Sequence, residues 1–563
     1  MMAEAQTQTA KHGAGGAAEF PTSFNVRHFG AKGDGVTIDS PAINKAIDAA
    51  AAVGGGTVVF PAGNYLSFSI RLKSHVHLYL SQGCTIIAAA SPLPGETTGY
   101  QGGTYDAAEP NTEWDAYQDY GHNHWHNSLI WGEGISDVGI TGPGVIYGKG
   151  LSFGAGPGRP PGHAGPGFGP ERPAAAAGTT AATAAPARPR RAPQPRGDYP
   201  MYQAEQAGVG NKAIALKNCH NVIFRDFAIL KGGHFGLLLT GVDNLTIDNL
   251  TIDTDRDGMD IDCCKNVRVS NCAVNSPWDD AIVPKSSYAL GYIRPCINMV
   301  ISNCYVTGTY ELGTMLDGTW KKFAPGAHMF GTGRIKFGTE SNGGFQNVTV
   351  TNCVFEGCQG LAFESDDGAI LEDMTVSNIT MRDIISAPIF MRLGSRLRGP
   401  KETTKVGAVR RIIISNIVSS NASSHLGCVI SGIPGYPIEN IRISNMYLEH
   451  KGGGTKEQAA LVPPEKEEGY PEPGMFGDMP SSAFFLRHVK NIDISDVQIV
   501  ATAPDQRPAF NLLDVDGADI YRVRTKEEAG VPKFVLNNVS NFSVGRTPGV
   551  KDTEIAKTEH ETL

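Results

Sequence analysis

The segment NVRVSNCAV at residues 266–274 is the clearest copy of a motif that recurs along the chain. Its form is Asn-h-x-h-Ser-Asn-h-x-h, where h is an apolar residue. Each half alternates apolar and polar residues, which is typical of a strand with one buried face. The central Asn marks a tight bend, because Asn tolerates a positive φ and bonds to its own backbone. Further copies are NMVISNCYV (298–306), NVTVTNCVF (347–355), DMTVSNITM (373–381), RIIISNIVS (411–419), NIRISNMYL (440–448) and NIDISDVQI (491–499), with weaker copies at 221–229 and 244–252.

The distance between successive bends indicates how the copies stack. The bends at 226, 249 and 271 are 23 and 22 residues apart, and those at 352 and 378 are 26 residues apart. Longer steps, such as 445 to 496, indicate inserted loops. A propeller blade needs about 40–50 residues, and a leucine-rich repeat would show its leucines. The sequence therefore predicts an all-β, right-handed parallel β-helix.

The sequence also indicates how the solenoid begins and ends and where it is interrupted by an insertion. Ser40 and Pro41 are expected to cap and begin a short helix that ends at Gly54–Gly56 and covers the open end of the stack. We expect the β-helix to span 24–545, with a flexible N-terminal tail at 1–23 and a C-terminal tail at 546–563. Residues 154–196 are mainly Gly, Pro, Ala and Arg. Such a segment cannot bury a core, so we expect a disordered insertion.

Composition excludes several classes of function. The net charge of −9 argues against nucleic acid as a partner, and no apolar run is long enough for a membrane span. The ten cysteines match no zinc pattern; disulfides and small buried side chains both remain open. The first residues show no signal peptide, although a mature form with an added start would look the same.

Acidic residues gather in two segments, IDTDRDGMDIDCC (252–264) and SPWDDAIVPKSS (276–287). Asp257 and Asp279 are 22 residues apart, the local coil length. Stacked coils lie about 4.8 Å apart, so we expect Asp257, Asp279 and Asp280 to form one patch. Met259 and Ile261 would point inward. Carboxyl groups this close have diverging pKa values, as glycoside hydrolysis requires; a calcium site or solvated turn residues are the alternatives.

The chain resembles glycoside hydrolase family 28, the polygalacturonase family of inverting β-helix enzymes. The resemblance runs from FNVRHFGAKGDGVTIDSPAINKAIDAA at 24 to about residue 545, although this opening is shared with pectate-lyase-like proteins. The family's Asn-Thr-Asp corresponds to 255–257, and its Asp-Asp to Asp279 and Asp280. The resemblance implies that Asp279 is the general acid, that Asp257 and Asp280 activate water, and that no metal or cofactor is needed.

Two departures from the family concern substrate binding. The family's Gly-His-Gly is replaced by GTGRIKFGTESNGG (331–344), so the helper histidine is absent. The family's Arg-Ile-Lys coil reads GLAFES (360–365), with Glu364 at a basic position. Arg334 and Lys336, in the preceding coil, are candidates for the missing cations; an outward strand end is the alternative. Glu364 would repel a uronate, which favours a rhamnogalacturonan-type backbone over plain polygalacturonate.

Other candidates line the expected groove less specifically. Lys285, Glu340 and Arg392 are further candidate substrate contacts. The segment HNHWHN (122–127) is expected to be a loop beside the site, with Trp125 offering a face for sugar stacking and no carboxylate partner for a metal at its histidines. YPEPGMFGDMP (470–480) is expected to form a rim loop.

The sequence predicts a secreted or periplasmic monomer that cleaves pectic oligo- or polysaccharide. Two other functions remain open. One is calcium-dependent β-elimination of the pectate-lyase type, and the other is a carbohydrate-binding or adhesive β-helix without catalysis.

Overall fold

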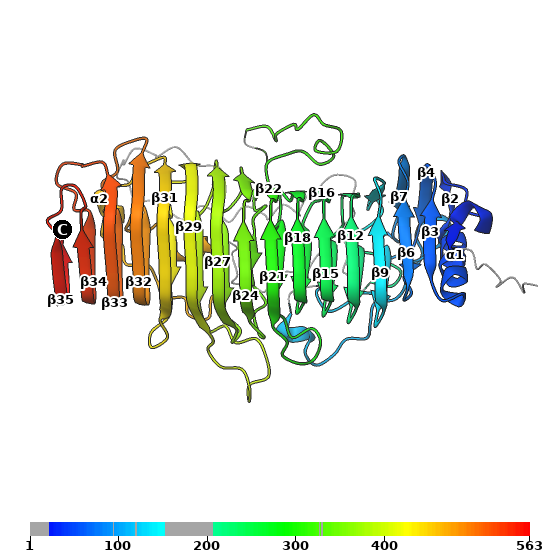
Figure 1. Cartoon of the computed structure of the whole chain (residues 1–563), viewed down its shortest axis with the longest axis horizontal. Coiled ribbons are helices and arrows are strands. Elements are labelled where there is room, and N and C mark those ends of the chain that lie inside the picture. The colour runs from blue at the N-terminus through cyan, green and yellow to red at the C-terminus, as the bar shows by residue number, and fades with distance from the viewer. Residues whose placement is uncertain (1–21, 94, 119–120, 153–205, 326, 328–329) are drawn as a thin grey trace, which may run out of the picture.

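The computed structural model describes residues 22–93, 95–118, 121–152, 206–325, 327 and 330–563. These residues form one elongated parallel β-helix, with the N-terminal coils at one end and the C-terminal coils at the other (Figure 1). The predicted insertion at 154–196 and nearly all of the predicted tail at 1–23 lie outside the described residues. No helix among the described residues is both long and apolar enough to cross a membrane.

Two parallel stacks contain the repeated motif, and its central Asn forms the corner between them. Asn271, Asn303 and Asn352 have φ values of 58°, 57° and 57°, as the motif predicted. Side-chain amides also link the coils, since Nδ2 of Asn303 donates to Asn271 (3.3 Å) and that of Asn352 to Asn303 (3.3 Å).

The first stack contains β3 (Gly56–Phe60), β6 (Val76–Leu80), β9 (Ser136–Thr141), β12 (His220–Arg225), β15 (Asp243–Asp248), β18 (Lys265–Ser270), β21 (Cys296–Ser302) and β24 (Phe345–Thr351). The second contains β4 (Gly63–Ser67), β7 (Cys84–Ala88), β10 (Val145–Tyr147), β13 (Ala228–Leu230), β16 (Thr251–Asp253), β19 (Ala273–Asn275), β22 (Tyr305–Thr307) and β25 (Val354–Glu356).

A third stack carries the acidic segments. It contains β5 (Ile70–Arg71), β8 (Ile130–Glu133), β11 (Lys212–Lys217), β14 (Phe235–Thr240), β17 (Asp257–Asp262) and β20 (Ile282–Lys285). A bridge from Ile282 to Ile335 continues it into β23 (Lys336–Phe337), β26 (Leu361–Ser365), β28 (Ile389–Leu393) and β30 (Cys428–Ser431). We call these strands the site sheet.

In the later coils the strands continue through the corners, where Asn378, Asn416 and Asn445 keep positive φ values. Longer strands run through both earlier stacks: β27 (Ile370–Arg382), β29 (Ala408–Ala422) and β31 (Ile438–His450). The next three also continue the site sheet: β32 (Phe484–Ala501), β33 (Phe510–Thr525) and β34 (Phe534–Gly545). Short helical segments interrupt the loops: η1 (Val26–Phe29), η2 (Tyr100–Gly102), η3 (Asp115–Tyr117), η4 (Pro473–Phe476) and α2 (Lys456–Ala459).

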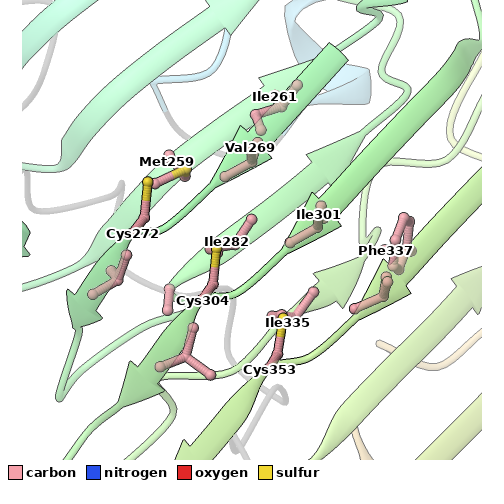
Figure 2. Close-up of a cluster of buried hydrophobic side chains, with 14 of the residues drawn as sticks. Met259, Ile261, Val269, Cys272, Ile282, Ile301, Cys304, Ile335, Phe337 and Cys353 are labelled. Atoms are coloured by element: carbon pink, nitrogen blue, oxygen red, sulfur yellow. The ribbon is translucent and has the colours of Figure 1, made fainter. Parts of the chain in front are cut away.

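The interior is filled by columns of apolar side chains. Cys272, Cys304 and Cys353 follow one another on successive coils, beside Ile282 and Ile335 of the site sheet (Figure 2). All ten cysteines are free and buried, so the small-side-chain alternative is confirmed. Met259 and Ile261 are fully buried in this core, as predicted.

The ends of the stack differ in part from the prediction. Helix α1 (Ser40–Ala52) packs on the first coils, but its cap is Asp39, whose carboxylate instead accepts from the N–H groups of Lys32 (2.7 Å) and Gly33 (2.9 Å). β1 (Ser23–Asn25) and β2 (Asp34–Ile38) pair with β3 and β4. The predicted tail at 546–563 is wrong, because β35 (Thr553–Thr562) pairs antiparallel with β34 and closes the C-terminal edge.

Candidate active site

The three predicted aspartates meet where two neighbouring strands of the site sheet begin. Asp257 is the first residue of β17, and Asp280 lies two residues before β20. One carboxylate oxygen from each of Asp257, Asp279 and Asp280 lies within 4.8 Å of the others. The predicted patch is therefore confirmed. Its register differs by one residue, because Met259 pairs with Ile282 and the Asp280 N–H donates to Asp257 Oδ1 (3.1 Å).

Asp280 is held in its ionised form by two cations. Arg334 Nε lies 2.8 Å from Asp280 Oδ1, and Lys336 Nζ lies 2.9 Å from Oδ2. Burial on its own would raise the pKa of Asp280, but these two cations outweigh it and lower the pKa to about 2. Arg334 and Lys336 thus lie in the coil after Asp280, as the coil count predicted.

Asp257 has the opposite environment. It is buried, with 4% of its surface exposed. Burial, followed by the charges of Asp260 and Asp279, raises its pKa well above the ordinary value for an aspartic acid. The patch therefore holds a proton beside an ionised carboxylate, which is the pairing that acid–base chemistry needs.

Asp279 is the most accessible of the three. Its side chain is 26% exposed, and that of Arg256 is 32% exposed. Arg256 donates to Asp279 Oδ2 through both Nη2 (2.8 Å) and Nε (3.2 Å). In the sequence, Arg256 lies between Asp255 and Asp257. The resemblance to family 28 assigned it no role.

A second layer of charges lies beside Asp257. His122 Nε2 is 2.9 Å from Asp260 Oδ2, and Lys285 Nζ is 3.8 Å from the same oxygen. Lys285 also pairs with Glu340 (2.9 Å), which accepts from Arg398 (3.0 Å). Burial and Lys285 lower the pKa of His122, but Glu340 and the contact with Asp260 outweigh them and raise it. Lys285 and Glu340, both predicted substrate contacts, are buried here and paired with each other.

His122 supplies an imidazole to the patch although the Gly-His-Gly motif is absent. Its partner Asp260 is 138 residues away in the sequence, so no local pattern could have shown the contact. The same segment corrects two predictions. Its histidines do have carboxylate partners, because His122 lies 2.9 Å from Asp260 and His126 lies 2.9 Å from Glu133. The second correction concerns Trp125. This side chain is 2% exposed, and its Nε1 donates to Thr240 (3.0 Å), so it offers no open face for a sugar.

Glu364 and Arg392 are adjacent in register on β26 and β28 and are fully buried. Neither carboxylate oxygen of Glu364 has a hydrogen-bond partner, and burial raises its pKa well above the ordinary value. The Arg392 guanidinium donates to Ser431 Oγ and to the carbonyls of Gly432, Glu465 and Lys466. Substrate contact by either residue stays a prediction.

The 470–480 segment lies at the patch, as the rim-loop prediction required. Glu472 Oε1 accepts from Arg334 Nη2 (2.5 Å), across 138 residues of sequence. The Tyr470 hydroxyl is 3.0 Å from Thr339 Oγ1, and Lys336 Nζ lies 5.7 Å from the centre of the Tyr470 ring. This segment therefore covers the two cations that hold Asp280.

Family models match two parts of the chain. Residues 23–107 match "Rhamnogalacturonase A/epimerase, pectate lyase-like", and residues 212–398 match "Right handed beta helix region". A family 28 exopolygalacturonase from Yersinia enterocolitica superposes with a TM-score of 0.53 at 17% identity, covering 92% of this chain and 78% of that one. The predicted resemblance to family 28 is confirmed. So is the right-handed parallel β-helix.

Relatives by sequence are distant or short. A probable polygalacturonase from Vitis vinifera is 24% identical over 451 residues, covering 76% of this chain and 74% of that protein. The plasmin and fibronectin-binding protein A of Streptococcus pneumoniae is 38% identical over 104 residues. That match spans only 14% of the pneumococcal protein and 18% of this chain.

Proposed function

We propose that this protein is a glycoside hydrolase that cleaves pectic polysaccharide of the galacturonan or rhamnogalacturonan type. The observation that carries the proposal is the clustering of Asp257, Asp279 and Asp280, with one oxygen of each within 4.8 Å of the others. Asp280 is held ionised by Arg334 and Lys336, while Asp257, within 4.8 Å, has a raised pKa. Hydrolysis of a glycosidic bond needs one protonated and one ionised carboxyl group at the same place.

In the proposed reaction, Asp279 donates a proton to the leaving glycosidic oxygen as the bond from the anomeric carbon breaks. A water molecule attacks that carbon and gives its proton to the pair Asp257 and Asp280. The role of Asp279 follows from the family resemblance. Without substrate, Arg256 contacts Asp279, and the raised pKa of Asp257 keeps the shared proton on that residue. A sugar that displaces Arg256 would let Asp279 take up this shared proton.

Inversion rests on the resemblance and not on the spacing. Inverting enzymes generally keep their two carboxyl groups about 6.5–9.5 Å apart, and retaining enzymes about 5–5.5 Å. The carboxylate oxygens in this patch are closer than the first range. However, a retaining mechanism needs a carboxylate that is free to attack, and Asp280 is held by two cations. This arrangement favours water activation over covalent attack.

The lyase alternative requires a bound cation. Asp257, Asp279 and Asp280 lie close enough to share one, but Arg256, Arg334 and Lys336 already contact two of them. A further positive charge in that place would be repelled by these three cations, so the patch fits calcium poorly. We further propose a secreted or periplasmic location, where a wall polysaccharide would be met.

The experiment compares wild type with Asp279→Asn on polygalacturonate and rhamnogalacturonan, measuring reducing ends and ultraviolet absorbance in parallel. We expect reducing ends without unsaturated product, no effect of chelator, and an activity loss of about 10²–10⁴-fold in the variant. The control is Asp262→Asn, at the end of β17, whose carboxylate accepts from Ser287 and Cys263. Growing absorbance would indicate a lyase, and equal background release by wild type and Asp279→Asn would indicate a binding protein.

A further inference from the structure

We propose that His126, Glu109 and Glu133 form a binding site for a divalent transition-metal ion, separate from the aspartate patch. One ligand atom from each residue lies within 4.8 Å of the others. His126 Nε2 is 2.9 Å from Glu133 Oε2 and 3.5 Å from Glu109 Oε1. The group joins the segment before β8 to the last residue of that strand.

Glu109 is oriented by the backbone. Its Oε2 accepts from the N–H groups of Trp125 (2.8 Å) and His126 (3.3 Å). Its Oε1 is buried and has no hydrogen-bond partner. A carboxylate held in this way by one oxygen presents the other to a ligand. Here that oxygen is buried without a hydrogen bond, which is costly, and its nearby ionisable group is His126 Nε2 at 3.5 Å.

His126 is fixed by an aromatic contact. Its ring lies 3.9 Å from that of Trp131, centre to centre, and Trp131 Nε1 donates to Asp106 (2.8 Å). This packing limits the rotation of the imidazole, so Nε2 stays directed at the two glutamates. Preorganised ligands reduce the cost of binding a metal.

The donor set suits an ion such as Zn²⁺. Imidazole nitrogen and carboxylate oxygen bind Zn²⁺ at about 2.0–2.2 Å, usually in tetrahedral geometry. Two tetrahedral ligand atoms at that distance from the ion are about 3.4 Å apart. This value lies between the 2.9 Å and 3.5 Å that separate His126 Nε2 from Glu133 Oε2 and Glu109 Oε1. The side chains of Glu109, His126 and Glu133 are 15%, 27% and 36% exposed, so an ion and a fourth, water ligand can reach them. Lys217, 3.1 Å from the other oxygen of Glu133, leaves Oε2 available.

An ion here would connect the segment before β8 to the site sheet. His122, which contacts Asp260, precedes His126 by only four residues. Binding would therefore hold the histidine of the second layer in place. The site itself does not depend on the proposed hydrolase activity, because its residues lie outside the patch.

The test titrates chelator-treated, desalted full-length protein with Zn²⁺ by calorimetry at neutral pH, and with Co²⁺ by visible absorption. We expect one Zn²⁺ per chain, a raised melting temperature, and the absorption bands of tetrahedral Co²⁺. His126→Ala and Glu109→Gln should each lose about tenfold or more in affinity. The amide oxygen of Gln can still accept both backbone hydrogen bonds, so Glu109→Gln separates ligand loss from misfolding.

The control is His75→Asn, since His75 is an exposed histidine with a single carboxylate, Asp137, at 3.3 Å. Asn tolerates the positive φ of 64° at this position. This control should bind Zn²⁺ like wild type. Equal binding by wild type, His126→Ala and Glu109→Gln, or no binding by wild type, would overturn the proposal. Because the readouts are binding and spectroscopy, they do not depend on whether the protein cleaves a sugar.

Discussion

Nε2 of His122 lies 2.9 Å from Oδ2 of Asp260, and both side chains are buried. The raised pKa of His122 favours the imidazolium, which balances the Asp260 charge beside Asp257. We therefore assign His122 as a positioning residue, because it acts on the patch through Asp260. This contact gives the first prediction.

Replacing His122 with Leu should lower kcat more than it changes KM. The change leaves Asp260 with Lys285 alone, and its charge then acts more strongly on the proton of Asp257. A buried carboxylate that loses its partner also costs about 1–3 kcal/mol of stability. His122→Gln, which can still donate to Asp260, should recover part of kcat. The measurements are pH profiles and melting curves; a loss confined to stability, or no rescue by Gln, would contradict the assignment.

The cations on Asp280 give a prediction about pH. Lys336→Met removes one of them, so the pKa of Asp280 should rise from about 2 by about 1–3 units. The pH at which kcat/KM falls on the acid side should then move upward. Lys336→Met should therefore lose more activity at acid pH than at neutral pH. Lys336→Arg should leave the pH of this fall in place. An unchanged pH of the fall in Lys336→Met would show that Asp280 does not need its negative charge.

The contact between Asp280 and Lys336 should also make the stability of the fold depend on pH. The pKa of Asp280 is lower in the folded protein, so the pair stabilises the fold above the unfolded pKa near 4. This contribution is lost as the pH falls from about 4 to about 2. Melting temperatures of wild type should decline over that window, and Lys336→Met should show a smaller decline.

The sequence predicted the parts of the molecule that depend on short-range patterns. Alternation around Asn271 and Asn303 indicated strands, and the coil length placed Asp257 beside the Asp279–Asp280 pair. Local patterns also fixed which way Met259 and Ile261 point. These features follow from a side-chain period of two and a repeat that packs only on its neighbours.

Contacts made by loops were not predictable in this way. His122 reaches Asp260 and Glu472 reaches Arg334, each across 138 residues. Nothing in either segment encodes the position of the other. Strand β35 was missed for a different reason: its side chains are mostly exposed, so it has no apolar alternation and is held by backbone pairing with β34.

Arg256 is the accessible cation of the patch, and we expect it to bind a uronate carboxylate. Arg256→Gln should raise KM for polygalacturonate by about 10–100-fold, since hydrogen bonds to charged groups contribute about 1.5–3 kcal/mol. KM for a methyl-esterified substrate, which lacks the charge, should change much less. Arg268→Gln is the control, because Arg268 lies on β18, outside the site sheet. Equal changes for both substrates would exclude a charge-specific role.

Asp366 gives a prediction about stability that is independent of the reaction. It is fully buried, neither carboxylate oxygen has a hydrogen-bond partner, and burial raises its pKa to about 7. An acid with a raised folded pKa stays protonated in the fold while the unfolded chain ionises. Stability should therefore fall as the pH rises from about 4 to about 7. Asp366→Asn should remove this slope and stabilise the protein at pH 7 by about 1–4 kcal/mol.

Asp367→Asn should instead destabilise the protein, because Asp367 pairs with Arg396 and its Oδ1 accepts from the Arg398 N–H (2.9 Å). Urea denaturation at several pH values measures both variants, and a wild-type slope that persists in Asp366→Asn would show that another buried acid causes it.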